Sequence, residues 1–114
     1  RQTQPARVSS KAVRLAMRRI QSDYAQPLSL EQVAAEVHLT PEYFSRIFKE
    51  EVGVTFVNYL TDVRLRRSVQ MLESTAKRVQ DVAQAVGYPN VSYFSTIFKK
   101  KYGMSPYEYR HRSE

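Results

Sequence analysis

Two segments of the sequence, 50 residues apart, place basic and hydrogen-bonding side chains on one face of a helix. At 100° per residue, this face of the first segment consists of Glu42, Ser45, Arg46 and Lys49. The same face of the second segment consists of Ser92, Ser95, Thr96 and Lys99. Small residues let a helix enter the major groove of DNA, and an arginine can bind guanine O6 and N7 bidentately. The alternative is an ordinary solvated helix surface, since most exposed helices have a polar outer face.

The composition favours a partner with negative charge. The 114 residues include 18 Lys and Arg against 11 Asp and Glu, which gives a net charge of +7 and a pI near 9.9. Such a balance is typical of polyanion-binding domains. The charge is uneven, because residues 1–57 carry a net +2 and residues 58–114 a net +5.

The chain contains no cysteine, which excludes disulfides, thiolate metal sites and a cysteine nucleophile. No apolar run approaches the roughly 18–20 residues of a membrane span, so no membrane association is expected.

The two segments belong to an internal repeat. Seven of eleven residue pairs between 43–53 and 93–103 are identical at an offset of 50. The match continues upstream at an offset of 49, where Val33 and Ala34 correspond to Val82 and Ala83. Two copies are too few for a solenoid. The sequence therefore predicts a duplicated small module.

Helical periodicity covers the whole chain, and alternating β patterns are absent. The apolar spacing predicts seven helices and no sheet, an all-α fold. The expected helices cover residues 10–25, 29–37, 40–52, 55–73, 79–86 and 91–103, and a short last helix opens at Ser105-Pro106. A short helix, a tight turn and a second helix form a helix-turn-helix, at residues 30–51 and again at 79–101. The long helix over 55–73 is expected to join the two units.

Local signals mark several helix ends. Thr40, Asn90 and Ser105 are suited to N-cap positions, and Pro41 fits the first turn. Gly53 and Gly103 are suited to end the helices that precede them. Arg78 stands where Ser29 stands in the first copy, so the helix over 79–86 is expected to lack a good cap.

The chain resembles the DNA-binding domain of the AraC/XylS family of bacterial transcription regulators over residues 10–112. The resemblance rests on Tyr43-Phe44-Ser45-Arg46-Ile47-Phe48-Lys49, Gly53, Val82-Ala83-x-x-Val86-Gly87-Tyr88, Tyr93-Phe94-Ser95, Phe98-Lys99, Ser105-Pro106 and Tyr109-Arg110. Within the family, the sequence is similar to the output domains of YesN-type two-component response regulators. The resemblance implies homeodomain-like duplicates whose third and sixth helices enter adjacent major-groove segments.

The resemblance also implies roles for particular side chains. The expected base-contacting residues are Glu42, Ser45, Arg46, Val91, Ser92 and Thr96. The expected phosphate-contacting residues are Lys49, Asn90, Lys99, Lys100 and Lys101. Asn90 is either a helix cap or a DNA contact, and Arg64 is assigned to internal packing or a salt bridge in preference to a phosphate contact. No catalytic residue, metal site or cofactor is expected.

The sequence departs from the family pattern at His38, Arg78 and Thr96. His38 replaces a frequent glycine in the first turn and is expected to adopt a left-handed backbone. Thr96 replaces a frequent arginine in the second recognition helix. The first unit is therefore expected to read sequence more sharply, while the second, with Lys99 to Lys101, supplies more anchoring.

The expected organisation is a linker from a missing N-terminal domain at 1–8, helix-turn-helix subdomains at 9–54 and 74–114, and a connecting helix at 55–73. The expected partner is promoter or operator duplex DNA, with RNA polymerase as a further candidate. The full-length protein is expected to dimerise through the missing domain and to act in the bacterial cytoplasm, at the nucleoid.

Other functions remain as alternatives. An enzyme is disfavoured, because His38 and His111 lack carboxylate partners at ligand spacing and no phosphate loop or nucleophile motif occurs. The recurrence of Tyr43 as Tyr93, and of Tyr59 as Tyr109, favours packing over tyrosine chemistry. A helical protein-interaction module would need an exposed aromatic patch. An AraC-type domain of a small-molecule-sensing regulator would share the same DNA-binding residues.

Overall fold

The computed structural model describes residues 3–112, with side chains from residue 11 onward. This part of the chain forms seven α-helices and no strand, which confirms the predicted all-α fold. The helices are α1 (Thr3–Asp23), α2 (Leu30–Glu36), α3 (Pro41–Val52), α4 (Phe56–Ser74), α5 (Val79–Ala85), α6 (Val91–Tyr102) and α7 (Pro106–Arg110). None of these helices is long and apolar enough to cross a membrane.

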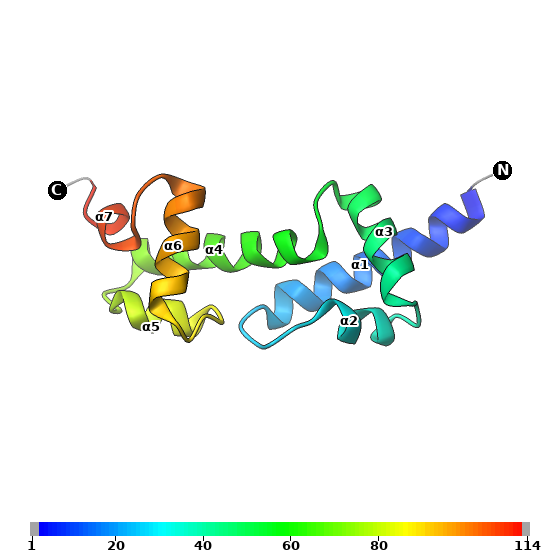
Figure 1. Ribbon diagram of the computed structural model, residues 1–114, viewed down its shortest axis with the longest axis horizontal. Helices are drawn as coiled ribbons and strands as arrows, with labels where there is room; N and C mark the ends of the chain where they lie inside the picture. The colour runs from blue at the N-terminus through cyan, green and yellow to red at the C-terminus, as the bar shows by residue number, and fades with distance from the viewer. Residues whose placement is uncertain (1–2, 113–114) are drawn as a thin grey trace. The chain divides into compact units, whose positions relative to one another are not determined.

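The chain divides into two compact units, Arg1–Val63 and Arg64–Glu114. Helices α1 to α3 and the first two turns of α4 make up the first unit, and the rest of α4 with α5 to α7 makes up the second (Figure 1). The boundary lies inside α4, the helix expected to connect the two repeats. Helix α1 begins at Thr3, earlier than the predicted start near residue 10. The assignment of residues 1–8 to an interdomain linker stays a prediction.

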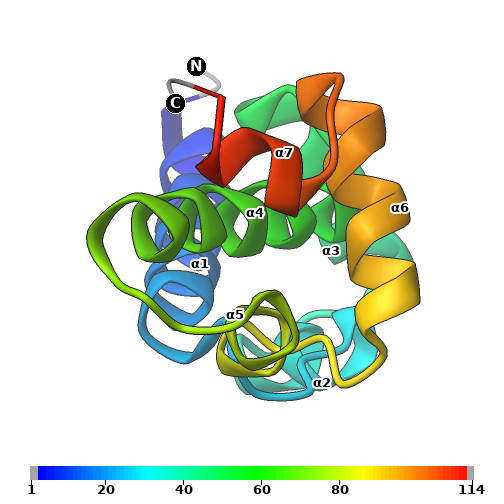
Figure 2. The same cartoon turned by 90° about the vertical axis from the view of Figure 1, so that its left-hand side faces the viewer.

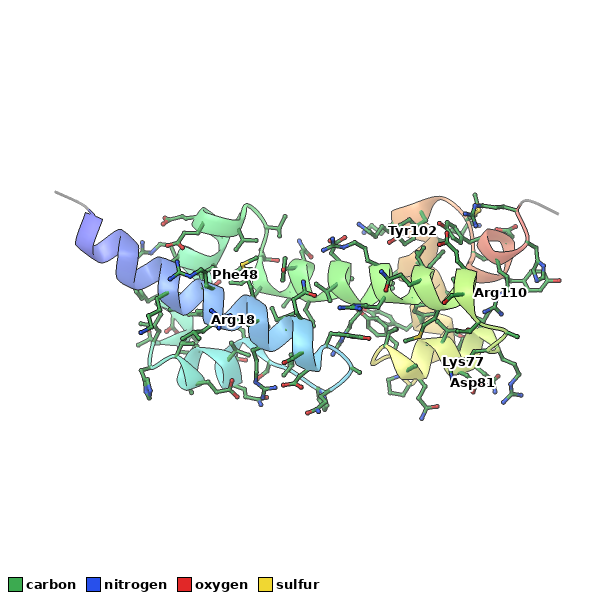
Figure 3. All side chains as sticks on the ribbon, turned by 180° about the vertical axis from the view of Figure 1, so that it is seen from behind. Arg18, Phe48, Lys77, Asp81, Tyr102 and Arg110 are labelled. Carbon is green, nitrogen blue, oxygen red and sulfur yellow. The ribbon has the colours of Figure 1, made fainter. Side chains whose placement is uncertain are left out.

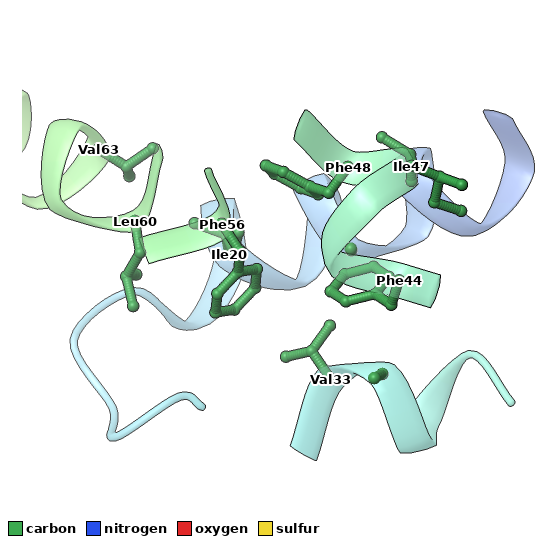
Figure 4. Close-up of a cluster of buried hydrophobic side chains, with 11 residues drawn as sticks. Ile20, Val33, Phe44, Ile47, Phe48, Phe56, Leu60 and Val63 are labelled. Carbon is green, nitrogen blue, oxygen red and sulfur yellow. The ribbon is translucent and has the colours of Figure 1, made fainter. Parts of the chain in front are cut away.

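The core of the first unit is built from the inward stripes of its four helical segments. Ile20 from α1, Val33 from α2, Phe44, Ile47 and Phe48 from α3, and Phe56, Leu60 and Val63 from α4 form one buried cluster (Figure 4). Phe48 is fully buried, and its ring centroid lies 5.8 Å from those of Phe44 and Phe56. Edge and tilted contacts at such distances add to the hydrophobic burial of each ring. This core holds α3 against α1 and α2.

The second unit repeats this arrangement. Phe94 and Phe98 of α6 are fully buried, with ring centroids 5.7 Å apart. Ser68 of α4 is fully buried, and its hydroxyl donates to the Leu65 carbonyl oxygen at 2.6 Å. This local bond satisfies a polar group that would otherwise be costly to bury. Because Phe44 and Phe48 of α3 and Phe94 and Phe98 of α6 are all fully buried, the inward faces predicted for these two helices are confirmed.

The predicted caps are present at three helix starts. Thr40 Oγ1 accepts a hydrogen bond from the Tyr43 amide at 3.2 Å, and Asn90 Oδ1 accepts one from the Tyr93 amide at 3.0 Å. Ser105 forms a full capping box with Glu108, in which each side chain accepts from the other residue's amide. Arg78 makes no side-chain cap bond to α5 and instead pairs with Asp81 at 3.2 Å.

The turn of the first helix-turn-helix uses a left-handed residue. His38 has φ of 62°, the conformation that the sequence predicts for it, and Gly87 occupies the matching turn of the second unit with φ of 102°. Histidine tolerates this region better than β-branched residues do. Each turn therefore reverses the chain within a few residues and brings the second helix across the first.

An ion-pair network joins α1 to α2. The Arg19 guanidinium donates to both carboxylate oxygens of Glu36, at 2.9 and 3.0 Å, and also bonds the Asp23 carboxylate on its own helix. The hydrogen bond from Arg19 holds the pKa of Glu36 below its ordinary value. Bidentate arginine–carboxylate pairs are the geometrically specific kind. This pair fixes the short α2 on the long α1.

We expect the Glu36→Gln variant to unfold at a lower temperature than the wild type at pH 7, by a small margin. Because the folded-state pKa of Glu36 is lowered, its contribution to stability is present above the ordinary glutamate pKa of about 4.3 and is lost as the pH falls through the folded value. Thermal melts at pH 7 and pH 3 measure this difference. Glu51→Gln, an exposed carboxylate of α3, is the control. An equal gap at both pH values would contradict the pairing.

Arg110 of α7 binds the end of α4 and the turn that precedes α5. Its guanidinium donates to the carbonyl oxygens of Leu72 at 3.1 Å, Thr75 at 3.2 Å and Lys77 at 2.5 Å. Figure 2 shows α7 beside the C-terminal part of α4, and Figure 3 labels Arg110 and Lys77 in this region. A cation near helix-terminal carbonyls is favourable. Arg110 therefore fixes the turn that leads into the second helix-turn-helix.

Candidate nucleic-acid interface

Helix α3 presents a mixed polar face on the side away from the core. Glu42, Arg46 and Lys49 are exposed and Ser45 is half-buried, opposite the buried Phe44, Ile47 and Phe48. The structure thus brings the four residues predicted on this helix onto one face. This face offers a carboxylate, a hydroxyl and two cationic groups within about two turns.

The second recognition helix, α6, has a smaller and less charged face. Ser92 and Thr96 are exposed, and Val91 and Ser95 are half-buried. The Thr96 hydroxyl donates to the Ser92 carbonyl oxygen at 3.0 Å, one turn earlier on the same helix. A hydroxyl used in this way keeps its acceptor lone pairs and its methyl group for other contacts. This geometry suits apolar contact with a thymine methyl better than hydrogen-bond donation.

Three consecutive lysines, Lys99, Lys100 and Lys101, are exposed in the last turn of α6. The matching positions of α3 hold Lys49, Glu50 and Glu51. Because the second unit has cations where the first has carboxylates, the two helices differ in their attraction for phosphate. The Lys101 ammonium also lies 5.5 Å from the centroid of the Tyr102 ring.

A match to a protein-family model covers much of the chain. The family described as "Helix-turn-helix domain" matches residues 33–112, which include both helix-turn-helix units. The chain belongs to the AraC-type helix-turn-helix family.

Solved structures similar to this AraC-type domain include two bacterial ones. The C-terminal domain of AraT, a response regulator from Geobacillus stearothermophilus, is 40% identical, with a TM-score of 0.86 over 89% of this chain and 84% of that one. The C-terminal domain of the two-component response regulator YesN from Fusobacterium nucleatum is 31% identical, with a TM-score of 0.84 over 88% of this chain and 98% of that one.

Among curated proteins, the bifunctional transcriptional activator/DNA repair enzyme AdaA of Bacillus subtilis is 37% identical over 95 residues. These residues are 83% of this AraC-type chain and 45% of AdaA. The chain therefore spans less than half of that relative. The AraC-type domain identifies the chain as the DNA-binding part of a transcription regulator.

Asn90 and Arg64 both have structural partners in the AraC-type domain. Asn90 caps α6 through its side-chain oxygen, so the cap role predicted for it is present. Its side-chain NH₂ is the group that a phosphate could accept from, and that role stays a prediction. The Arg64 guanidinium lies 5.1 Å from the centroid of the buried Tyr88 ring. This contact agrees with the packing role that the resemblance implies for Arg64.

The two pairs of recurring tyrosines differ in how deeply they pack. Tyr59 and Tyr109 are half-buried, each 5.7 Å from the ring centroid of a core phenylalanine. Tyr43 and Tyr93 are more exposed, at 37% and 57%, although the Tyr93 ring centroid lies 5.8 Å from that of the buried Tyr88. Recurrence alone does not distinguish core from surface. The spacing is ambiguous too, since Tyr43 precedes the exposed Arg46 by three residues and the buried Ile47 by four.

The four core phenylalanines of α3 and α6 are fully buried, which argues against the protein-interaction alternative. The sequence does not indicate the structural roles of Arg19 and Arg110, although Arg110 belongs to the motif that carries the family resemblance. Each has partners 17 or more residues away, Glu36 for Arg19 and Leu72 for Arg110, and no local pattern marks such pairs.

Proposed function

We propose that this chain is the output domain of a bacterial response regulator and binds duplex DNA sequence-specifically. In this proposal, α3 and α6 each enter a major-groove segment. The observation that supports it most is that α3 and α6 have the same two faces. On each helix, buried phenylalanines lie on one side and exposed hydrogen-bonding or cationic side chains on the other. The similarity to the C-terminal domains of AraT and YesN favours the response-regulator setting over a small-molecule sensor.

The proposed base contacts follow from the chemistry of each side chain. Arg46 reads guanine, Glu42 accepts a hydrogen bond from cytosine N4, and Thr96 contacts a thymine methyl. Ser45 and Ser92 supply adaptable hydrogen bonds, and Val91 supplies a second apolar contact. The proposed phosphate contacts are Lys49, Asn90, Lys99, Lys100 and Lys101. Contact with RNA polymerase and dimerisation of the full-length protein remain predictions.

Selection of bound duplexes from a random library, followed by footprinting of the best duplex, tests the proposal. We expect one enriched sequence with two separately protected major-groove segments. Enrichment of no sequence above the starting library, together with binding that is indifferent to salt between ~50 and ~200 mM, would contradict it.

We expect Arg46→Ala to weaken binding to the selected duplex by about 1–3 kcal/mol and to relax preference at one base pair. The reason is that a bidentate arginine–guanine contact discriminates among bases by this amount. Fluorescence anisotropy on the selected duplex and on single-base variants of it measures the effect. Equal losses on the selected and scrambled duplexes would show that Arg46 binds phosphate instead.

A further inference from the structure

Arg46 lies between two side chains of its own helix, and neither belongs to the predicted DNA-contacting set. Its guanidinium carbon lies 5.0 Å from the centroid of the Tyr43 ring, one turn earlier. Its Nη1 lies 3.8 Å from a carboxylate oxygen of Glu50, one turn later. The Arg46 and Glu50 side chains are 60% and 63% exposed, so both are open to a ligand.

The two neighbours attract the guanidinium in different ways, Tyr43 through its ring and Glu50 as an ion pair whose 3.8 Å distance is longer than a hydrogen bond. An aromatic ring attracts a cation through its face, and a guanidinium over a ring keeps its in-plane N–H groups for hydrogen bonds. A carboxylate that pairs fully with an arginine instead accepts from those in-plane N–H groups. Bidentate recognition of guanine needs the same N–H groups. Tyr43 is therefore compatible with guanine binding by Arg46, whereas Glu50 competes with it.

The second unit lacks this arrangement. At the positions that match Tyr43, Arg46 and Glu50, it has Tyr93, Thr96 and Lys100. The tyrosine is repeated, but the arginine that it would support and the carboxylate that would compete are both replaced. Any effect that depends on the arginine is thus confined to the first unit, and Tyr93 provides an internal control.

We propose that Tyr43 and Glu50 are positioning residues that tune guanine reading by Arg46 in opposite directions. Tyr43 raises the fraction of molecules in which the in-plane N–H groups of Arg46 are available to hydrogen-bond a guanine, and Glu50 lowers that fraction. Apparent affinity scales with the fraction of the binding-competent arrangement, so each residue changes affinity without touching DNA. This inference rests on the proposed function, because it requires Arg46 to read a base.

The Glu50 arm compares two neighbouring carboxylates of α3. On the selected duplex, Glu50→Gln is expected to bind about twofold more tightly than Glu51→Gln, since exposed i,i+4 pairs are worth only a few tenths of a kcal/mol. Glu51→Gln removes the same charge one residue away and measures the general repulsion of phosphate. In an Arg46→Ala background, the two glutamate variants are expected to bind equally.

The Tyr43 arm uses the aromatic ring as the variable. Tyr43→Ala is expected to weaken binding to the selected duplex about 2- to 5-fold, as an exposed cation–aromatic contact permits, and to leave scrambled-duplex binding unchanged. Tyr43→Phe keeps the ring and is expected to match the wild type. In an Arg46→Ala background, the Tyr43→Ala effect is expected to vanish, whereas a Tyr93→Ala effect is expected to be the same in both backgrounds. Circular dichroism confirms the fold of each variant, and if Tyr43→Ala does not fold, Tyr43→Leu replaces it.

The double-mutant comparisons separate this inference from the proposed function. If Arg46→Ala affects the selected and scrambled duplexes equally, the reading role of Arg46 fails and the inference fails with it. If Arg46→Ala reduces selective binding but the Glu50 and Tyr43 effects persist without the arginine, the proposed function stands and the inference is overturned. Equal affinities of Glu50→Gln and Glu51→Gln in the wild-type background overturn the Glu50 arm.

Discussion

Replacing Phe48 with alanine is expected to lower the free energy of unfolding of the first unit by about 3–5 kcal/mol. Phe48 is fully buried and contacts three aromatic rings, those of Phe44, Phe56 and Tyr59, at centroid distances of 5.7–5.8 Å. Truncation removes the buried area of a whole ring and leaves a cavity that these neighbours fill only in part. Since small domains are stable by only about 5–15 kcal/mol, this loss is a large fraction of the total stability.

Urea titration followed by circular dichroism measures the loss. Val57→Ala is the control, because Val57 is 61% exposed at the start of α4 and surface truncations usually change stability by less than about 0.5 kcal/mol. Phe98→Ala tests the second unit in the same way. A loss below about 1 kcal/mol for Phe48→Ala would show that the ring does not support the core.

Much of the fold is predictable from the sequence because local rules dominate in short helices. The repeat identifies two helix-turn-helix units, and helical spacing separates Phe44 and Phe48 from the polar face of α3. Thr40 and Asn90 cap as expected, because a side-chain oxygen needs only the amide three residues later. The left-handed backbone of His38 likewise follows from the tight turn that it occupies.

The features that the sequence does not reveal are non-local. Arg110 donates to carbonyls 33 to 38 residues away, and backbone acceptors leave no residue-type signature. The Arg19–Glu36 pair spans 17 residues and depends on how α2 lies on α1.

The exposure of Tyr43 is a different case. An aromatic residue at the border between the buried and exposed faces of a helix can pack against the core or lie at the surface. Its place near Arg46 depends on the rotamers of both side chains, which spacing alone does not set. The predicted contacts of α3 and α6 with DNA remain predictions, since they concern a partner whose sequence the chain does not encode.

The combined substitution Lys99→Ala, Lys100→Ala and Lys101→Ala is expected to reduce the salt dependence of DNA binding. Each phosphate contact contributes about 0.9 to the slope of log affinity against log salt. Loss of three contacts therefore lowers the magnitude of the slope by about 3 and weakens binding to selected and scrambled duplexes alike. Because the slopes differ, the ratio of wild-type affinity to variant affinity falls on the order of 40-fold between ~50 and ~200 mM salt.

Anisotropy titrations at four salt concentrations measure this slope. Lys77→Ala, which removes one exposed cation from the turn between α4 and α5, is compared with Lys99→Ala. Removal of a charge outside the predicted phosphate-contacting set is expected to change the slope little, because the slope reflects the number of phosphates that are neutralised. If Lys77→Ala lowers the slope as much as Lys99→Ala does, the attraction is that of overall net charge. The prediction that the first unit mainly recognises bases while the second mainly binds phosphates then loses its electrostatic basis.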